Sequence, residues 1–189
     1  MGIQGDQWIR RHEVTVDQYH RMGETGVLSP HDRVELVAGE VIDMAPIGSR
    51  HAGHVRKLTK LLSAAVGEAA QVSVQNPVQL GLKSEPEPDI ALLRPQSDFY
   101  TERHPSATDV LLIIEVAETS QRYDREVKLP LYAQQGIPEV WIVDTENKSV
   151  SIYRSPTADG YLQHESLGRP GMVTLSALPA VSVDLSTLL

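Results

Sequence analysis

The stretch Val110-Leu-Leu-Ile-Ile-Glu-Val-Ala117 decides the fold class. It is apolar at consecutive positions except at Glu115, a pattern typical of a central strand with both faces of its sheet covered. A carboxylate inside such a strand loses its hydration, so Glu115 is expected to face a cation, a hydrogen-bond network or a cleft. These eight residues therefore predict a buried sheet and make Glu115 a candidate functional carboxylate, with a solvent-facing acid or an arginine partner as the less favoured alternative.

The segments around this strand predict an α/β fold with a central mixed β-sheet flanked by helices. Thr15 is a candidate N-cap for the first helix, Gly136 is a candidate C-cap for the last, and Pro130 is expected to kink that last helix. Helices are expected over residues 14–22, 51–68 and 122–135, a hairpin over 33–44, and strands over 71–75, 78–82, 89–93, 139–144, 149–153 and 161–167. The tail, residues 173–189, is expected to form a strand or turn that ends in a short helix.

The length of 189 residues predicts one domain over residues 1–189, with a short N-terminal arm of about residues 1–13. The absence of cysteine excludes disulfides, thiolate metal sites and cysteine nucleophiles. The longest apolar run, residues 110–114, is far shorter than the ~20 residues of a membrane helix, and no signal peptide is readable. We therefore expect a cytoplasmic protein with no membrane partner.

The formal net charge of −8, from 25 acids and 17 bases, argues against a protein that coats phosphates with a basic surface. It allows an enzyme that meets nucleic acid through a local basic patch and bound cations. Candidate phosphate-binding residues cluster on the two longer helices: Arg50, Arg56, Lys57 and Lys60, and Arg122, Arg125 and Lys128. A solvated helix face is the alternative for both clusters, and for Lys60 it is the preferred one.

Two further acids lie next to apolar strand residues. Asp89 opens the segment Asp-Ile-Ala-Leu92, and Glu35 lies within Val34-Glu-Leu-Val37. Because neighbouring strands are about 4.8 Å apart, two carboxylates at one level of a sheet can share a hard metal ion. A solvent-facing acid or an arginine partner remains the alternative for each acid, and a simple Pro-Asp turn remains one for Asp89.

The chain resembles the Uma-two family, which is assigned to the PD-(D/E)XK restriction-endonuclease-like superfamily. The resemblance covers about residues 14–185. It rests on Arg33-Val-Glu-Leu-Val-Ala-Gly-Glu40, Pro88-Asp-Ile-Ala91 and Ile114-Glu-Val-Ala117, followed by Asp124, Lys128, Tyr132, Gly136-Ile-Pro138 and Trp141-Ile-Val-Asp144. It implies a restriction-endonuclease-like core that hydrolyses phosphodiester bonds with a divalent metal, Mg²⁺ or Mn²⁺.

The resemblance also implies the roles of individual residues. Asp89 would be the first motif acid and Glu115 the second, with the backbone carbonyl of Val116 as a third metal ligand and Glu35 as an additional catalytic acid. The motif lysine is missing, because its position two residues after Glu115 holds Ala117.

We expect Lys128 to replace the missing lysine. It lies four residues after Asp124 on a shared helix face. An ordinary surface Asp–Lys pair is the alternative.

Two histidines, His51 and His54, stand three residues apart and could suggest a zinc pair. The resemblance places a histidine of the family at His51, but no third zinc ligand follows at motif spacing, so a helix-start or surface role is expected.

The expected function is metal-dependent cleavage of nucleic acid, with DNA as the favoured substrate and RNA left open. The competing hypothesis is a catalytically inactive nuclease fold that serves as a dimeric binding or regulatory module, which Ala117 and the acidic charge favour. In either case we expect a homodimer, because the apolar tail, residues 173–189, and the strand around Trp141 offer apolar surface.

Overall fold

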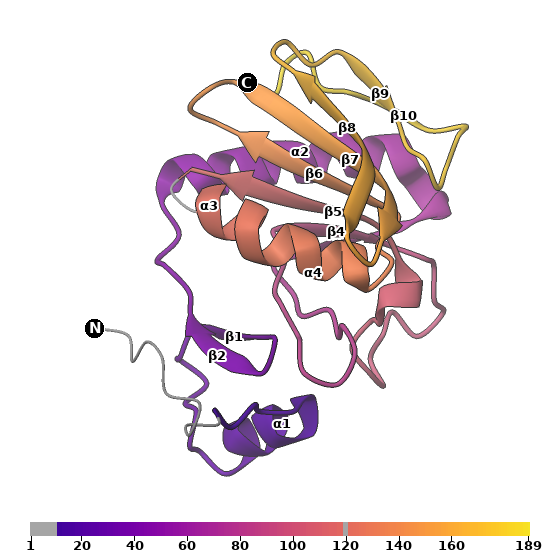
Figure 1. Ribbon diagram of the computed structural model, residues 1–189. Helices are drawn as coiled ribbons and strands as arrows, with labels where there is room; N and C mark the ends of the chain where they lie inside the picture. The colour runs from indigo at the N-terminus through magenta and orange to yellow at the C-terminus, as the bar shows by residue number, and fades with distance from the viewer. Residues whose placement is uncertain (1–10, 119–120) are drawn as a thin grey trace.

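The computed structural model describes residues 11–118 and 121–189. Its centre is a six-stranded sheet in the order β3-β4-β5-β6-β7-β8 (Figure 1). Only the β5–β6 pair is parallel among these neighbours, so the sheet is mixed and the expected α/β class is confirmed. Its strands are β3 (Gln71–Val74), β4 (Ile90–Leu93), β5 (Val110–Ala117), β6 (Glu139–Asp144), β7 (Ser149–Thr157) and β8 (Gly160–Leu167).

Strand β5 is buried along its whole length, as its apolar sequence predicts. From Leu112 onward its side chains alternate between two cores, with Ile114 packed in the core under α2 (Ser49–Val66) and Ile113 in the core under α4 (Leu129–Gln134). The two helices lie on opposite faces of the sheet (Figure 1). Because side chains two apart on a strand share a face, Glu115 and Ala117 lie on the α4 side.

The expected helix over residues 122–135 is divided into three parts. These are α3 (Gln121–Tyr123), a π-helical turn η3 (Asp124–Lys128) and α4. Pro130 explains the division, because it has no N–H and its ring would clash with the carbonyl of Glu126 in an α-helix. The wider π-turn relieves that clash. The helix ends at Gln134 with Gln135 as its C-cap, and Gly136, the expected C-cap, follows one residue later with a φ of 75°.

The N-terminal part of the described chain packs below the sheet edge in Figure 1. Helix α1 (Val16–Glu24) begins with the expected Thr15 cap, which forms a capping box with Gln18. Strands β1 (Val34–Val37) and β2 (Glu40–Asp43) form the expected hairpin. Its turn places Gly39 at φ 80°, and a Cβ there would lie 2.7 Å from the Cβ of Glu13.

Two expected elements are wrong. Residues 78–82 form no strand: Val78 and Leu80 are buried, but their N–H groups bond to Pro86 and Ser84 in a tight loop. The facing segment contains Pro86 and Pro88, which cannot donate to a strand ladder. The tail forms two paired strands, β9 (Met172–Thr174) and β10 (Ser182–Asp184), and ends in a turn instead of a helix.

The apolar surface on which the homodimer prediction rested is buried within the chain. Trp141 is fully enclosed, and Val173, Val183, Leu185 and Leu188 pack into the core under α2. That argument for a dimer is therefore wrong, while the oligomeric state itself stays a prediction.

The expected N-terminal arm lies outside the described residues up to position 10, and Glu13 within it pairs with Lys83. None of the helices in the described ranges has the length and hydropathy needed to span a membrane.

Candidate active site

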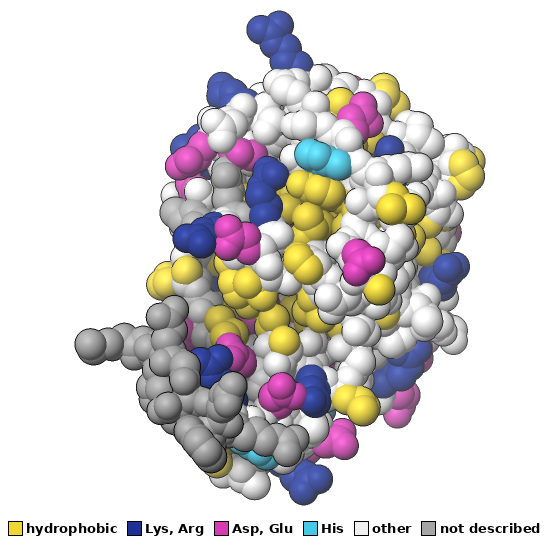
Figure 2. All heavy atoms as spheres, viewed as in Figure 1, with side chains coloured by type: hydrophobic (Ala, Val, Ile, Leu, Met, Phe, Trp, Pro, Cys, Tyr) yellow, Lys and Arg dark blue, Asp and Glu magenta, His cyan; other side chains and the backbone are white. Residues whose placement is uncertain are grey.

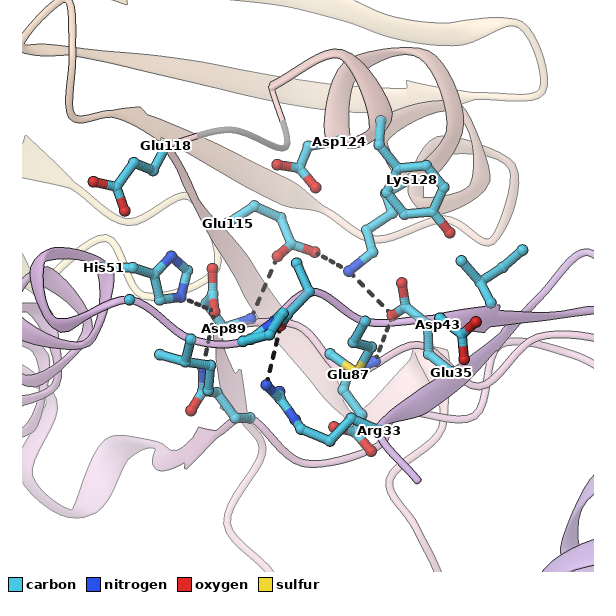
Figure 3. Close-up of a pocket in the computed structure, with 18 residues that line it drawn as sticks. Arg33, Glu35, Asp43, His51, Glu87, Asp89, Glu115, Glu118, Asp124 and Lys128 are labelled. Atoms are coloured by element: carbon cyan, nitrogen blue, oxygen red, sulfur yellow. Dashed lines mark hydrogen bonds and ion pairs between the residues drawn. The ribbon is translucent and has the colours of Figure 1, made fainter. Parts of the chain in front are cut away.

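All four catalytic residues expected from the sequence line one cavity of about 350 Å³ (Figure 3). Glu35 comes from β1, Asp89 from the turn before β4, Glu115 from β5 and Lys128 from the π-turn η3. We call this cavity the acid pocket. The antiparallel pairing of β4 with β5 brings the first two motif acids to one level, as expected.

The acid pocket carries a large excess of negative charge. Two permanently basic side chains line it, Arg33 and Lys128. Seven carboxylates line it: Glu35, Asp43, Glu87, Asp89, Glu115, Glu118 and Asp124. Such a cavity concentrates cations, and oxygen donors of this kind are those that Mg²⁺ and Mn²⁺ prefer.

The Asp89 carboxylate is fixed by hydrogen bonds on both oxygens. The N–H of Val116 donates to Oδ2 at 2.8 Å, and the side chains of His51 and Gln75 lie 2.8 and 3.2 Å from Oδ1. The backbone N–H of Asp89 itself approaches Oε2 of Glu115 at 3.4 Å. The two motif acids are therefore held against each other by the backbone of their own strands.

Glu115 is only 4% exposed, and this burial raises its pKa to about 8. The ammonium of Lys128 opposes that rise, while Asp124 and Asp89 add to it. The hydroxyl of Tyr132 donates to Oε1 at 2.5 Å, and Nζ of Lys128 lies 3.4 Å from the same oxygen. A carboxylate so reluctant to ionise gains strongly from a nearby cation.

Lys128 is nearly as deeply buried, and its ammonium bridges two acids. Nζ lies 3.1 Å from Oε2 of Glu35, in addition to its contact with Glu115. Burial favours the neutral amine, but Glu115, Glu35 and Asp124 together raise the pKa of Lys128 above its usual value. The alternative of a surface Asp–Lys pair is excluded, and the lysine is a fixed cation instead of a proton acceptor.

Glu35 connects the hairpin to the segment of residues 84–89. Its Oε2, which contacts Lys128, also accepts the N–H of Glu87 at 3.1 Å. The pKa of Glu87 is raised by its own burial and by the charge of Glu35. The solvent-exposed alternative for Glu35 is therefore wrong.

His51 belongs to this site, which the sequence interpretation of a helix-start or surface role missed. Its pKa is raised, first by the hydrogen bond to Asp89, against the opposing effect of burial, and also by hydrogen bonding to the Val116 backbone. The backbone of Val116, the expected third metal ligand, is therefore hydrogen-bonded to both Asp89 and His51. The resemblance at position 51 was the one signal for this role, while His54 is half-buried on α2 and its Nδ1 contacts the Arg50 carbonyl at 3.0 Å.

Ala117 occupies the position of the missing motif lysine. It is fully buried in the core under α4, on the same face of β5 as Glu115. Lys128 enters the site from the helical segment that covers this face (Figure 3).

The expected phosphate-binding clusters do not line the acid pocket apart from Lys128. Arg122 pairs with Glu126 on the surface, and Arg125 bonds to Tyr153 and Ser151. On the part of one face that the structure describes, basic and acidic side chains are interspersed instead of gathered by sign (Figure 2). Arg56 and Lys60 line a separate groove along α2, which shares Gln75 with the acid pocket.

A solved structure from Anabaena variabilis ATCC 29413, titled a "putative nuclease belonging to DUF820", has a similar fold. It matches with a TM-score of 0.71 at 15% identity, over 93% of this chain and 97% of that chain. The two chains therefore share one α/β fold. A search of curated proteins found no significant match.

Residues 16–186 match the profile of the Uma2 family, which is described as "Putative restriction endonuclease". The chain belongs to this family, and the resemblance drawn from the sequence is confirmed over nearly the same residues.

Proposed function

We propose that this protein is a divalent-metal-dependent nuclease that hydrolyses phosphodiester bonds of DNA in the acid pocket. The observation that carries the proposal is the contact between Asp89 and Glu115 in a cavity lined by seven carboxylates and one buried ammonium. Family membership and fold support the same chemistry.

The donor set fits Mg²⁺ or Mn²⁺. Asp89 and Glu115 offer hard carboxylate oxygens, with the carbonyl of Val116 as a third donor, and Mg²⁺ commonly binds through one or two carboxylates and retained waters. When bound there, the ion supplies an activated water and neutralises charge on the phosphate.

The chain's own residues would prepare the rest of the reaction. Val116, His51 and Gln75 hold the Asp89 carboxylate in one orientation. Lys128, which stays protonated beside Glu115 and Glu35, supplies the fixed positive charge that the missing motif lysine would have given. Glu35 holds that ammonium in place.

The test is cleavage of supercoiled plasmid with Mg²⁺ or Mn²⁺, with parallel assays on single-stranded DNA and RNA. We expect nicking that stops with a chelator and falls about 100-fold or more in Asp89→Asn and Glu115→Gln. The exposed Glu102→Gln is the matched control and should cut as the parent does.

Equal cleavage by all variants would show that the reaction takes place elsewhere. Absence of cleavage of every substrate by the parent protein would favour the inactive binding module.

A further inference from the structure

A second group of metal-ligating side chains lies outside the acid pocket. His20 from α1, Glu85 from the 84–89 segment and His104 from the loop before η2 (Ala107–Asp109) converge from three distant parts of the sequence. One ligand atom from each lies within 4.8 Å of the others. None of the three lines the acid pocket.

Glu85 is the centre of this group and is 3% exposed. Both of its carboxylate oxygens face Nε2 of His20, at 2.8 and 3.0 Å. A buried carboxylate needs a cationic partner, and one imidazolium could supply it. The second imidazole, on the exposed His104, packs edge-on against His20 with 5.9 Å between ring centroids. The ion pair alone does not require it.

We propose that His20, Glu85 and His104 form a binding site for a transition-metal ion of the zinc class. Two imidazole nitrogens and one carboxylate oxygen are a common ligand set for Zn²⁺, which binds such atoms at about 2.0–2.2 Å and leaves a fourth position to water. The three ligand atoms now lie within 4.8 Å of one another, so small side-chain rotations would let them surround a single ion.

The surroundings leave room for the fourth ligand. A cavity of about 340 Å³ opens beside the site and is lined by both histidines. Imidazole ligands favour Zn²⁺, Co²⁺ or Ni²⁺ over Mg²⁺, so this site and the acid pocket differ in the metal that they select.

An ion at this site would fasten α1 to the backbone that carries the acid pocket. The N–H of Glu85 bonds to the carbonyl of Leu36 at 2.7 Å, next to Glu35. Two and four residues later, Glu87 and Asp89 line the acid pocket. The ion would therefore stabilise the segment that holds two pocket acids, whether or not the protein cleaves nucleic acid.

The test is calorimetric titration of Zn²⁺ into the chelator-treated full chain, with thermal melting of the same samples. We expect one equivalent of tightly bound zinc and a higher melting temperature, both retained in excess Mg²⁺. His104→Ala should weaken binding about 100-fold or more and remove the thermal shift, since even outer-shell partners of a metal contribute 10–100-fold. The exposed His31→Ala is the matched control and should bind as the parent does.

Two further variants separate this site from the acid pocket. Asp89→Asn should keep the zinc, and Glu85→Gln should lose it. If Glu85→Gln does not fold by circular dichroism, His104→Ala decides, because its side chain is on the surface. Zinc binding that survives His104→Ala, that disappears only in Asp89→Asn, or that is absent from the parent overturns the proposal.

Discussion

Lys128 holds its charge in a nearly dry environment between two carboxylates, at 5% exposure. Glu115 is held there by the same ammonium and by the Tyr132 hydroxyl. Removing one partner of a buried pair leaves the other charge uncompensated, which is more costly than the pair itself is stabilising. Substitutions at this residue should therefore act on folding as well as on catalysis.

We predict that Lys128→Met lowers the free energy of unfolding by about 3–5 kcal/mol and abolishes cleavage. Adding Glu115→Gln to Lys128→Met should recover part of that stability, because the double variant leaves one buried acid, Glu35, without the ammonium instead of two. Urea denaturation of the two single variants and the double variant measures both effects. Unchanged stability in Lys128→Met would contradict the burial of the pair.

Lys128→Arg distinguishes charge from shape at the same position. A guanidinium keeps the positive charge but is planar and larger than the ammonium. We expect a folded protein with reduced cleavage, measured in the plasmid assay. Full activity in Lys128→Arg would mean that charge alone is sufficient there.

At the level of elements, the π-turn η3 places Lys128 and Asp124 together in the acid pocket. The N–H of Leu129 bonds to the carbonyl of Asp124, five residues back, and the next residue is Pro130. Turns of this kind are often found at functional sites. Here Pro130 is the local cause of the turn, because its ring would clash with the carbonyl of Glu126 in an α-helix.

Pro130→Ala tests that cause. Alanine removes the clash and restores an N–H, so the segment can return to an α-helical pattern that rotates Asp124 relative to Lys128. We expect a stability change within about 1 kcal/mol, because a gained hydrogen bond offsets the greater freedom of the unfolded chain. Cleavage should fall nonetheless. Retained activity would show that the proline does not set the geometry.

The 3-10 turn η2 offers a pH-dependent test outside the acid pocket. The Arg103 guanidinium, and the N–H and hydroxyl of Ser106, hold the pKa of Asp109 down at about 2. A folded-state pKa below the unfolded one means stability that is complete above pH 4 and lost as the pH falls toward 2. Asp109→Asn should weaken this pH dependence of the melting temperature. An unchanged acid profile would contradict it.

Sequence patterns predicted this fold where hydrophobic periodicity and local chemistry agree. Strand β5, the hairpin over residues 33–44 and the Thr15 cap were all predictable from short segments. Residues 78–82 were misassigned because their apolar alternation does not show which segment will lie opposite them, and that segment contains Pro86 and Pro88. The expected strand in the tail is present, but its expected final helix is wrong, because the partner of the tail, α2, lies more than 100 residues away in the chain.

The acid pocket was predictable only in part for the same reason. Asp89 and Glu115 stand out as acids in apolar strands. His51 does not, because its role depends on a hydrogen bond to a residue 38 positions away. The segregation of Arg122 and Arg125 from the pocket depends on helix rotation, which the π-turn changes.

At the level of the whole molecule, the tail is part of the core. Leu185 is fully buried against α2, so Leu185→Ala should lower the free energy of unfolding by about 2–5 kcal/mol. Leu162→Ala, at an exposed position of β8, is the control and should change it by less than about 0.5 kcal/mol. Thermal or urea unfolding gives both values, and equal effects would contradict the packing of the tail.

The homodimer is tested separately, by light scattering at micromolar concentration. We expect a particle of twice the chain mass, and a 20.8 kDa particle would contradict it. Leu185→Ala should leave the measured mass unchanged wherever the protein remains folded, since this side chain faces the chain's own core.

The acid pocket draws its groups from positions 35, 89, 115 and 128, and β5 is enclosed by β6, which comes later still. A ribosome delivers these groups in that order, acids first and ammonium last. Until residue 128 has emerged, the growing polypeptide holds these carboxylates without the lysine that pairs with them, and until residue 144 has emerged β5 lacks its partner β6. Under the proposed function, the unfinished chain thus has no assembled centre with which to cut the nucleic acid around it during translation.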